Sequence, residues 1–261
     1  MRRLIPLLIL GGALAAGGAR AGEARCWYEN GALVVPAALG NVAGDFVLDT
    51  SAPRSALHDT IAMAAGLTGE TVTDDFRLAG ERVTGLEVEV QDLDARSVGF
   101  PTTIVGVIGA DVLARYVVDI DFAPCRITLH RRPPAPWPGA ARLRVAMAAG
   151  IPAVTAEVSD GTAVRRGLFA VDTASAGVRL DPTEAAFSRP LAEGVDPTLR
   201  FRPPARLAAL AVAGEVVTLT PAGLLEAPAP PLAGAIGDAV WSRFRLRLDL
   251  ARGRLDLLKV P

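Results

Sequence analysis

Two aspartates, Asp49 and Asp172, stand in matching surroundings in the two halves of the chain. The first lies in the segment FVLDTSA (46–52) and the second in FAVDTAS (169–175). In each segment an apolar run typical of a strand ends at the aspartate, and a threonine and two small residues follow. Two carboxylates presented in this way can activate a water molecule, one as general base and the other as general acid. The residue types and their spacing therefore predict acid–base chemistry by a pair of aspartates.

The surroundings of the two aspartates belong to a longer internal repeat. Asp172 follows Asp49 by 123 positions, and the segment GAIG at 234–237 follows GVIG at 106–109 by 128 positions. Two closing segments keep the same offset of 128: YVVDIDF at 116–122 and FRLRLDL at 244–250. Ordered motifs at a nearly constant offset indicate an internal duplication.

The duplication predicts two lobes with the same order of elements, one at 22–130 and one at 141–261. The proline-rich segment RRPPAPWPGA at 131–140 is typical of a linker between them. The alternation of apolar and polar residues over 86–91 predicts a half-buried strand. Further expected elements are a helix at 59–65 closed by Gly66, a hairpin turn at Ala79-Gly80, a short helix at 110–115, and a helix that begins at Asp181 with Pro182 and Glu184 in its first turn.

The composition excludes several classes of function. Hydrophobic residues make up 51% and charged residues 21% of the 261 residues, as in a chain with a packed core. The formal charge of −1 argues against a nucleic-acid-binding surface. The few cysteines and histidines do not form the pattern of a zinc site: Cys26, Cys125, His58 and His130. We expect no metal, no organic cofactor and no nucleic-acid partner, with His58 at a solvated helix start and His130 at a strand end.

The first 21 residues have the pattern of a signal peptide. Arg2 and Arg3 precede an apolar run at 4–16, and Ala19-Arg20-Ala21 is a small-x-small cleavage pattern. We therefore expect export to the periplasm or secretion, without stable membrane insertion after cleavage. A retained membrane anchor is the alternative, although the run is short for a bilayer span. In an exported protein, a single pair of cysteines is more often a disulfide than a metal site.

The paired motifs resemble those of the aspartic peptidases, both the pepsin-like and the retropepsin-like families, including bacterial exported members. The shared pattern is Asp-Thr/Ser-Gly in each half, then a hydrophobic-hydrophobic-Gly motif, then two closing strands. The resemblance covers the chain from about residue 26 to the end. It implies a mostly β, bilobal fold in which Asp49 and Asp172 are the catalytic residues, side by side at a pseudo-twofold axis on the floor of a cleft.

The resemblance also implies roles for residues around the dyad. Thr50 and Thr173 would hydrogen-bond across the axis, and Ser175 would bond the outer oxygen of Asp172. Ser51 and Ala174 occupy the positions where the family has glycine. The flap over the cleft would be the hairpin at Ala79-Gly80, with Phe76 as the nearest aromatic residue. A disulfide between Cys26 and Cys125 is implied as well, because the N-terminal strand of this family lies near the closing strands.

Two functions fit these observations. The first is an aspartic endopeptidase that binds an extended peptide or protein substrate and works as a monomer, since both aspartates lie on one chain. The alternative is a non-catalytic protein of the same fold that binds a peptide or an envelope partner in the cleft. A purely structural β protein does not explain two Asp-Thr pairs in register. A serine hydrolase built on Ser175 is excluded, because no histidine follows that residue.

Overall fold

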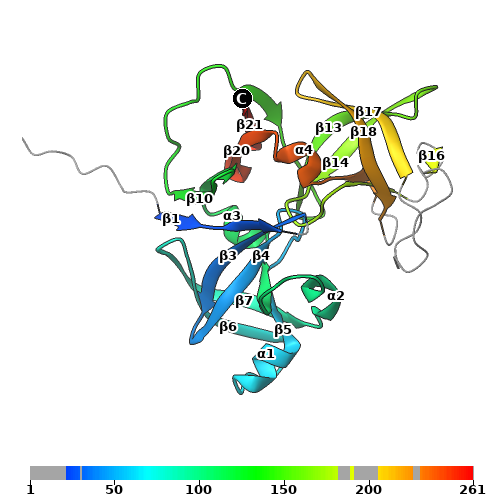
Figure 1. Ribbon diagram of the computed structural model, residues 1–261. Coiled ribbons are helices and arrows are strands. Elements are labelled where there is room, and N and C mark those ends of the chain that lie inside the picture. The colour runs from blue at the N-terminus through cyan, green and yellow to red at the C-terminus, as the bar shows by residue number, and fades with distance from the viewer. Residues whose placement is uncertain (1–21, 30, 182–188, 191–204, 226–229, 261) are drawn as a thin grey trace, which may run out of the picture.

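The computed structural model describes residues 22–29, 31–181, 189–190, 205–225 and 230–260. The chain forms two β lobes joined by a third sheet, as Figure 1 shows. The signal peptide expected at 1–21 and the helix expected after Asp181 lie outside the described residues. Within the described part, no helix has both the length and the apolar character that a membrane span needs.

The first lobe is a seven-stranded sheet in the order β2-β3-β4-β8-β5-β7-β6. Its strands are β2 (Trp27–Glu29), β3 (Ala32–Leu39), β4 (Val42–Leu48), β5 (Ala56–His58), β6 (Thr71–Leu78), β7 (Glu81–Gln91) and β8 (Ile104–Ile108). Its helices are α1 (Asp59–Ala64), α2 (Asp94–Ser97) and α3 (Ala110–Leu113). Gly66 follows α1 with a φ of 72°, so the expected glycine end of this helix is confirmed.

The second lobe is an eight-stranded sheet in the order β12-β13-β14-β19-β15-β18-β17-β16. Its strands are β12 (Ala146–Ala148), β13 (Ile151–Ser159), β14 (Val164–Val171), β15 (Val178–Leu180), β16 (Arg189–Pro190), β17 (Ala205–Val212), β18 (Glu215–Leu224) and β19 (Leu232–Ile236). The helix α4 (Asp238–Trp241) follows β19 as α3 follows β8. The predicted duplication is therefore visible as two sheets with the same core order.

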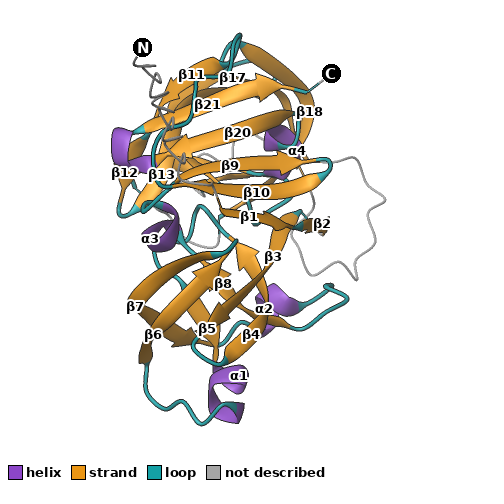
Figure 2. Cartoon of the chain, turned by 90° about the vertical axis from the view of Figure 1, so that its left-hand side faces the viewer, coloured by secondary structure: helices purple, strands orange, loops and turns teal. Residues whose placement is uncertain are grey.

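A six-stranded sheet joins the lobes in the order β1-β10-β9-β20-β21-β11. Its strands are β1 (Gly22–Arg25), β9 (Val117–Phe122), β10 (Cys125–His130), β11 (Ala141–Arg144), β20 (Phe244–Asp249) and β21 (Arg254–Lys259), with a 3-10 helix at Leu250–Arg252. β9 from the first half and β20 from the second pair in an antiparallel manner at its centre, and Figure 2 shows them side by side. The two halves of the repeat thus share one sheet.

Glycine at the centre of each lobe is required by close packing. β4 runs parallel to β8, and β14 runs parallel to β19, each pair with a bulge just before a phenylalanine. A Cβ at Gly106 would lie 2.3 Å from the Ala56 carbonyl oxygen and 2.6 Å from the Phe46 ring. A Cβ at Gly234 would lie 2.2 Å from the Arg179 carbonyl oxygen. Backbone therefore approaches backbone at the same point of both lobes, which only glycine allows.

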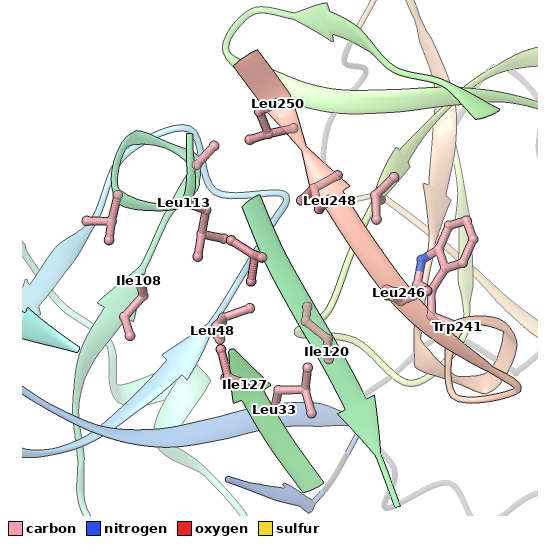
Figure 3. Close-up of a cluster of buried hydrophobic side chains, with 14 of the residues drawn as sticks. Leu33, Leu48, Ile108, Leu113, Ile120, Ile127, Trp241, Leu246, Leu248 and Leu250 are labelled. Carbon is pink, nitrogen blue, oxygen red and sulfur yellow. The ribbon is translucent and has the colours of Figure 1, made fainter. Parts of the chain in front are cut away.

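The largest cluster of buried side chains runs through the joining sheet, and each lobe has a smaller cluster of its own. Figure 3 shows side chains from both lobes and from the joining strands: Leu33, Leu48, Ile108, Leu113, Ile120, Ile127, Trp241, Leu246, Leu248 and Leu250. All belong to a single cluster of buried residues. Because this cluster includes residues of both lobes and of the joining strands, packing connects the two lobes.

A disulfide ties the start of the described chain to the joining sheet. Cys26 and Cys125 are bonded with an S–S distance of 2.06 Å, and the Cys26 N–H donates to the Cys125 carbonyl oxygen at 3.3 Å. The pairing implied by the family resemblance is therefore confirmed. It closes a loop of 99 residues that contains nearly the whole first lobe.

The proline-rich segment between β10 and β11 is fixed to the joining sheet. The Trp137 ring lies 4.1 Å from the Arg247 guanidinium and 4.9 Å from that of Arg245. Arg247 also donates to the Ala135 carbonyl oxygen at 2.7 Å and forms two bonds of 2.6 and 2.7 Å to the buried Asp119. Cation–π contacts and a buried ion pair therefore hold this segment in place.

Candidate active site

Strand pairing places each of the two aspartates at the end of a buried strand. Asp49 follows β4 and Asp172 follows β14. The N–H of Asp49 donates to the Ile108 carbonyl oxygen, and the N–H of Asp172 donates to the Ile236 carbonyl oxygen, both at 3.0 Å. The exposed fractions of the two aspartates are only 1% and 0%. Each aspartate is therefore buried and anchored by the same backbone hydrogen bond.

Hydrogen bonds across the pseudo-twofold axis bring the two turns together. The N–H of Thr50 donates to the Thr173 hydroxyl at 3.2 Å, and that hydroxyl donates to the Leu48 carbonyl oxygen at 2.7 Å. The Thr50 hydroxyl donates in turn to the Val171 carbonyl oxygen. The residues just before and just after each aspartate thus touch the opposite turn. This is the contact that the family resemblance implies for the two threonines.

The turns keep their hydrogen bonds although neither has the glycine of the family pattern. The N–H groups of Ser51 and Ala174 each donate to Oδ1 of their own aspartate at 2.8 Å. Neither residue is among the described ones with positive φ, so the turn does not require glycine. The Ser51 hydroxyl adds a bond of 2.6 Å to Asp49 Oδ1. Ser51 and Ala174 therefore support the turns without changing their shape.

The remaining oxygen of each aspartate faces other partners. The Ser175 hydroxyl donates to Asp172 Oδ2 at 2.6 Å, the bond expected for this residue. Oδ2 of Asp172 also accepts from the Arg179 guanidinium, and Oδ2 of Asp49 accepts from the Arg96 guanidinium. Each aspartate thus holds one arginine at its Oδ2.

Sequence reasoning missed both arginines. Arg96 lies on α2, 47 positions after Asp49, and no motif marks it. Arg179 lies on β15, at the position that Ala56 occupies in β5 of the first lobe, because Ala56 pairs with Val107 as Arg179 pairs with Ala235. That difference between the two repeats was the one available signal.

A third carboxyl group lies close to the dyad. Asp238 begins α4, its exposed fraction is 0%, and its N–H donates to the Ser175 carbonyl oxygen at 2.8 Å. Neither of its carboxyl oxygens has a hydrogen-bond partner among the described residues. Burial, together with the nearby charges of Asp172 and Asp49, raises the pKa of Asp238 to about 9. This carboxyl is therefore protonated and neutral at pH 7.

Asp238 also could have been noticed in the sequence. It stands 128 positions after Ala110, directly after the second copy of the hydrophobic-hydrophobic-Gly motif. The repeats agree in the motif itself and differ at the next residue. A carboxyl group in place of a methyl group, beside a predicted pair of aspartates, is a difference with chemical meaning.

A pocket lies beside Asp49 in the first lobe. Its volume is about 210 Å³, and its wall includes Ser51 and Ala52 of the turn, Arg54, Glu89 and Arg96. The Arg54 guanidinium is already paired with Glu89 at 3.1 Å. The pocket therefore combines part of the aspartate turn with charged side chains of both signs.

His58 supports the helix that carries Arg96. It is buried, with an exposed fraction of 4%, so the expectation of a solvated position is wrong. Its Nδ1 lies 2.8 Å from Asp59, and its Nε2 lies 3.2 Å from Asp94 at the start of α2. His130 does end β10, as expected, and contacts Asp119 at 3.0 Å.

The expected flap does not match the structure. β6 and β7 form the predicted hairpin, with φ of 53° at Ala79 and 79° at Gly80 in its turn. However, Phe76 is buried against the Phe46 ring, with the ring centroids 5.6 Å apart. The turn itself packs on β1, where a Cβ at Gly22 would lie 2.3 Å from the Ala79 carbonyl oxygen. Phe76 is therefore part of the core and Ala79 part of the contact with the joining sheet, while Gly80 is exposed at the tip of the turn.

Comparison with known proteins supports the fold. No known family model and no curated protein sequence matches the chain. Among solved structures, the aspartic proteinase from Irpex lacteus superposes with a TM-score of 0.58 over 92% of this chain and 98% of that protein, at 12% sequence identity. Such a low identity speaks for the fold alone. The chain has the mostly β, bilobal fold of the aspartic proteinases.

Proposed function

We propose that this protein is an aspartic endopeptidase in which Asp49 and Asp172 activate a water molecule. The observation that supports the proposal is the set of hydrogen bonds between the two Asp-Thr turns, each of which carries a buried aspartate. Two carboxylates at close range share one proton. That state supplies a general base and a general acid in one place.

The reaction would follow from this shared proton. The ionised carboxylate takes a proton from the water as its oxygen attacks the carbonyl carbon of the peptide bond. The protonated carboxyl donates to the carbonyl oxygen. Collapse of the resulting diol breaks the C–N bond, and a proton from the dyad passes to the leaving amine. The N–H groups of Ser51 and Ala174 would keep both carboxyl groups in position throughout.

The substrate would be an extended peptide or an unfolded segment of a protein, bound in the cleft by strand-like hydrogen bonds. We propose that the protein works as a monomer without a metal or an organic cofactor, because one chain supplies both carboxylates. The disulfide between Cys26 and Cys125 supports export to the periplasm or secretion, since such bonds persist in oxidising compartments.

A second function is favoured by one observation. Arg96 and Arg179 occupy Oδ2 of the two aspartates, where an active dyad needs its proton and its substrate. A protein that only binds a peptide or an envelope partner in the cleft would not be harmed by these ion pairs. This non-catalytic protein is the alternative.

Cleavage of an unfolded protein across a pH series separates the two functions. The protein would be compared with Asp49→Asn, Asp172→Asn and the control Asp160→Asn, whose side chain caps an exposed turn. Activity that is lost in both dyad variants and kept in the control supports the peptidase. Absence of cleavage at every pH, by protein with a cooperative unfolding transition, would leave the binding function.

A further inference from the structure

We propose that the cleft selects peptides with an acidic side chain on each side of the scissile bond, and that Arg96 and Arg179 bind those two carboxylates. The inference rests on the proposed peptidase function, because it names the substrate class of the same site. It starts from the ion pairs that each arginine makes with Asp49 or Asp172.

The two arginines stand where the scissile bond has to be bound. Oδ1 of each aspartate accepts a hydrogen bond from an N–H of its own turn, while Oδ2 accepts a hydrogen bond from the arginine. In the proposed mechanism, Oδ2 must meet the water and the scissile carbonyl. A guanidinium at Oδ2 blocks that approach. Both arginines therefore have to move to another anion before the dyad can act.

In both ion pairs the arginine is the exposed partner and the aspartate is the buried one. The side chains of Arg96 and Arg179 are 48% and 39% exposed, whereas those of Asp49 and Asp172 are 2% and 0% exposed. The aspartates are also fixed by the hydrogen bonds of their turns. An exchange of partners thus means that the guanidinium turns away while the carboxylate stays in the site.

The first lobe has a place for the incoming carboxylate. The pocket of about 210 Å³ next to Asp49 has Arg96 and Arg54 in its wall. Arg54 is already paired with Glu87 at 2.5 Å and with Glu89 at 3.1 Å. An acidic side chain in this pocket would therefore be bound by Arg96, which would exchange one carboxylate for another.

The second lobe has an arginine at a position equivalent to one in the pocket wall of the first lobe. Arg179 on β15 corresponds to Ala56 on β5, and Ala56 lines the pocket of the first lobe. The repeat thus puts a methyl group on one side of the dyad and a guanidinium on the other. Because a peptide crosses both lobes, one arginine would meet a side chain before the scissile bond and the other a side chain after it.

Only an anionic substrate can make this exchange at little cost. Charge-assisted arginine–carboxylate bonds are of similar strength for one carboxylate and another, so the exchange between two carboxylates is nearly balanced. A neutral side chain would leave the arginine at the dyad, and a basic side chain would be repelled by it. We expect a preference for glutamate over glutamine of at least about tenfold at each of the two positions.

The test compares peptides that differ only in charge. One quenched fluorescent peptide carries glutamate on both sides of the scissile bond, and a second carries glutamine there; both have blocked termini. A third is the glutamine peptide with a free C-terminal carboxylate, which separates binding of a side chain from binding of a chain end. Values of kcat/KM are measured at pH 6 for the wild type, Arg96→Gln, Arg179→Gln and the conservative Arg96→Lys. Arg82→Gln serves as the control, since Arg82 forms an exposed pair with Asp75.

We expect the wild type and the Arg82 variant to prefer the glutamate peptide by at least about tenfold for each position. Arg96→Gln and Arg179→Gln should each reduce the preference by about tenfold, the share of one position, and Arg96→Lys should keep part of that share. Equal cleavage of the glutamate and glutamine peptides by the wild type would overturn this inference and leave the peptidase function standing. A preference for the free C-terminus would also overturn it.

A binding measurement keeps the inference testable without turnover. Fluorescence anisotropy would follow peptides in which the scissile bond is reduced to a methylene amine. Binding of the glutamate peptide that depends on both arginines, without cleavage of any peptide, would support the acidic ligand class and contradict the peptidase function. Absence of any difference between the reduced glutamate and glutamine peptides would contradict the acidic ligand class.

Discussion

Asp238 should make the folded protein lose stability as the pH rises. Its carboxyl has an ordinary pKa of 3.8 and a pKa of about 9 in the folded protein. Below about pH 4 both the folded and the unfolded state bind the proton. Between pH 4 and pH 9 the unfolded state releases it while the folded state retains it, so unfolding releases a proton. The free energy of unfolding then falls by about 1.4 kcal/mol per pH unit until the folded carboxyl ionises.

The substitution Asp238→Asn removes this dependence and preserves the shape of the side chain. Between pH 5 and pH 8, the wild type should lose about 4 kcal/mol of stability relative to the variant. For a chain of this size the loss corresponds to a relative change in melting temperature of roughly 10 °C. Asp238→Ala, which reproduces the Ala110 of the first lobe, should behave in the same way.

Calorimetric melting of both proteins at one-unit pH intervals and constant ionic strength measures the effect. The melting temperatures of the wild type and the variant should differ least at pH 4. The melting temperature of the variant relative to that of the wild type should then rise with each step up to about pH 9. A difference in melting temperature that stays constant over this range would refute the argument, because it would mean that the buried carboxyl does not hold its proton.

Three further changes test the frame around the site. Thr173→Val removes the hydroxyl that links the two turns and should cost about 2–4 kcal/mol in denaturant unfolding, because a buried N–H and a buried carbonyl lose their partner; a loss below 0.5 kcal/mol would contradict this role. Cys26→Ala opens the 99-residue loop and should cost about 4–5 kcal/mol, while reduction of the wild type should cost the same. Arg247→Met leaves the buried Asp119 without its main partner and should cost about 3–5 kcal/mol, against less than about 1 kcal/mol for Arg82→Met at the surface. Equal losses for the two arginines would show that burial of the first pair has no energetic effect.

The repeat could be read from the sequence because the fold requires it at fixed points. Gly106 and Gly234 are needed where backbone approaches backbone, and the apolar strands before Asp49 and Asp172 are needed to fill the core. Such positions tolerate few residue types, so both copies keep them. The fold and the two Asp-Thr turns followed from these positions.

The expected flap failed for a physical reason. Alternation of apolar and polar residues predicts a hairpin, but it does not predict which other part of the protein the turn of the hairpin will contact. Phe76 is the aromatic residue nearest to the hairpin turn, as expected for a flap. However, β6 pairs with β3 in a register that sets Phe76 opposite Leu39, and this register directs the Phe76 ring into the core. The contact of Ala79 with Gly22 then depends on the joining sheet, whose strands come from distant parts of the sequence.

The arginines of the site were not predicted, because an ion pair between segments far apart in the sequence produces no periodic pattern in that sequence. Arg96 reaches Asp49 from α2, whose first residue, Asp94, contacts His58. Arg179 could be noticed only as a departure from the repeat. Core positions are thus shared by both halves, whereas the residues that give the site its charge are the ones in which the halves differ.

Three titratable or charged side chains surround the dyad. Arg96 pairs with Asp49, Arg179 pairs with Asp172, and the buried Asp238 carboxyl is neutral at pH 7. If an acidic substrate draws both guanidinium groups away, two carboxylates are left close together without cations. Their mutual repulsion then favours uptake of one proton between them. Arrival of the substrate would therefore free Oδ2 of both aspartates and supply the dyad with the proton that its general acid requires.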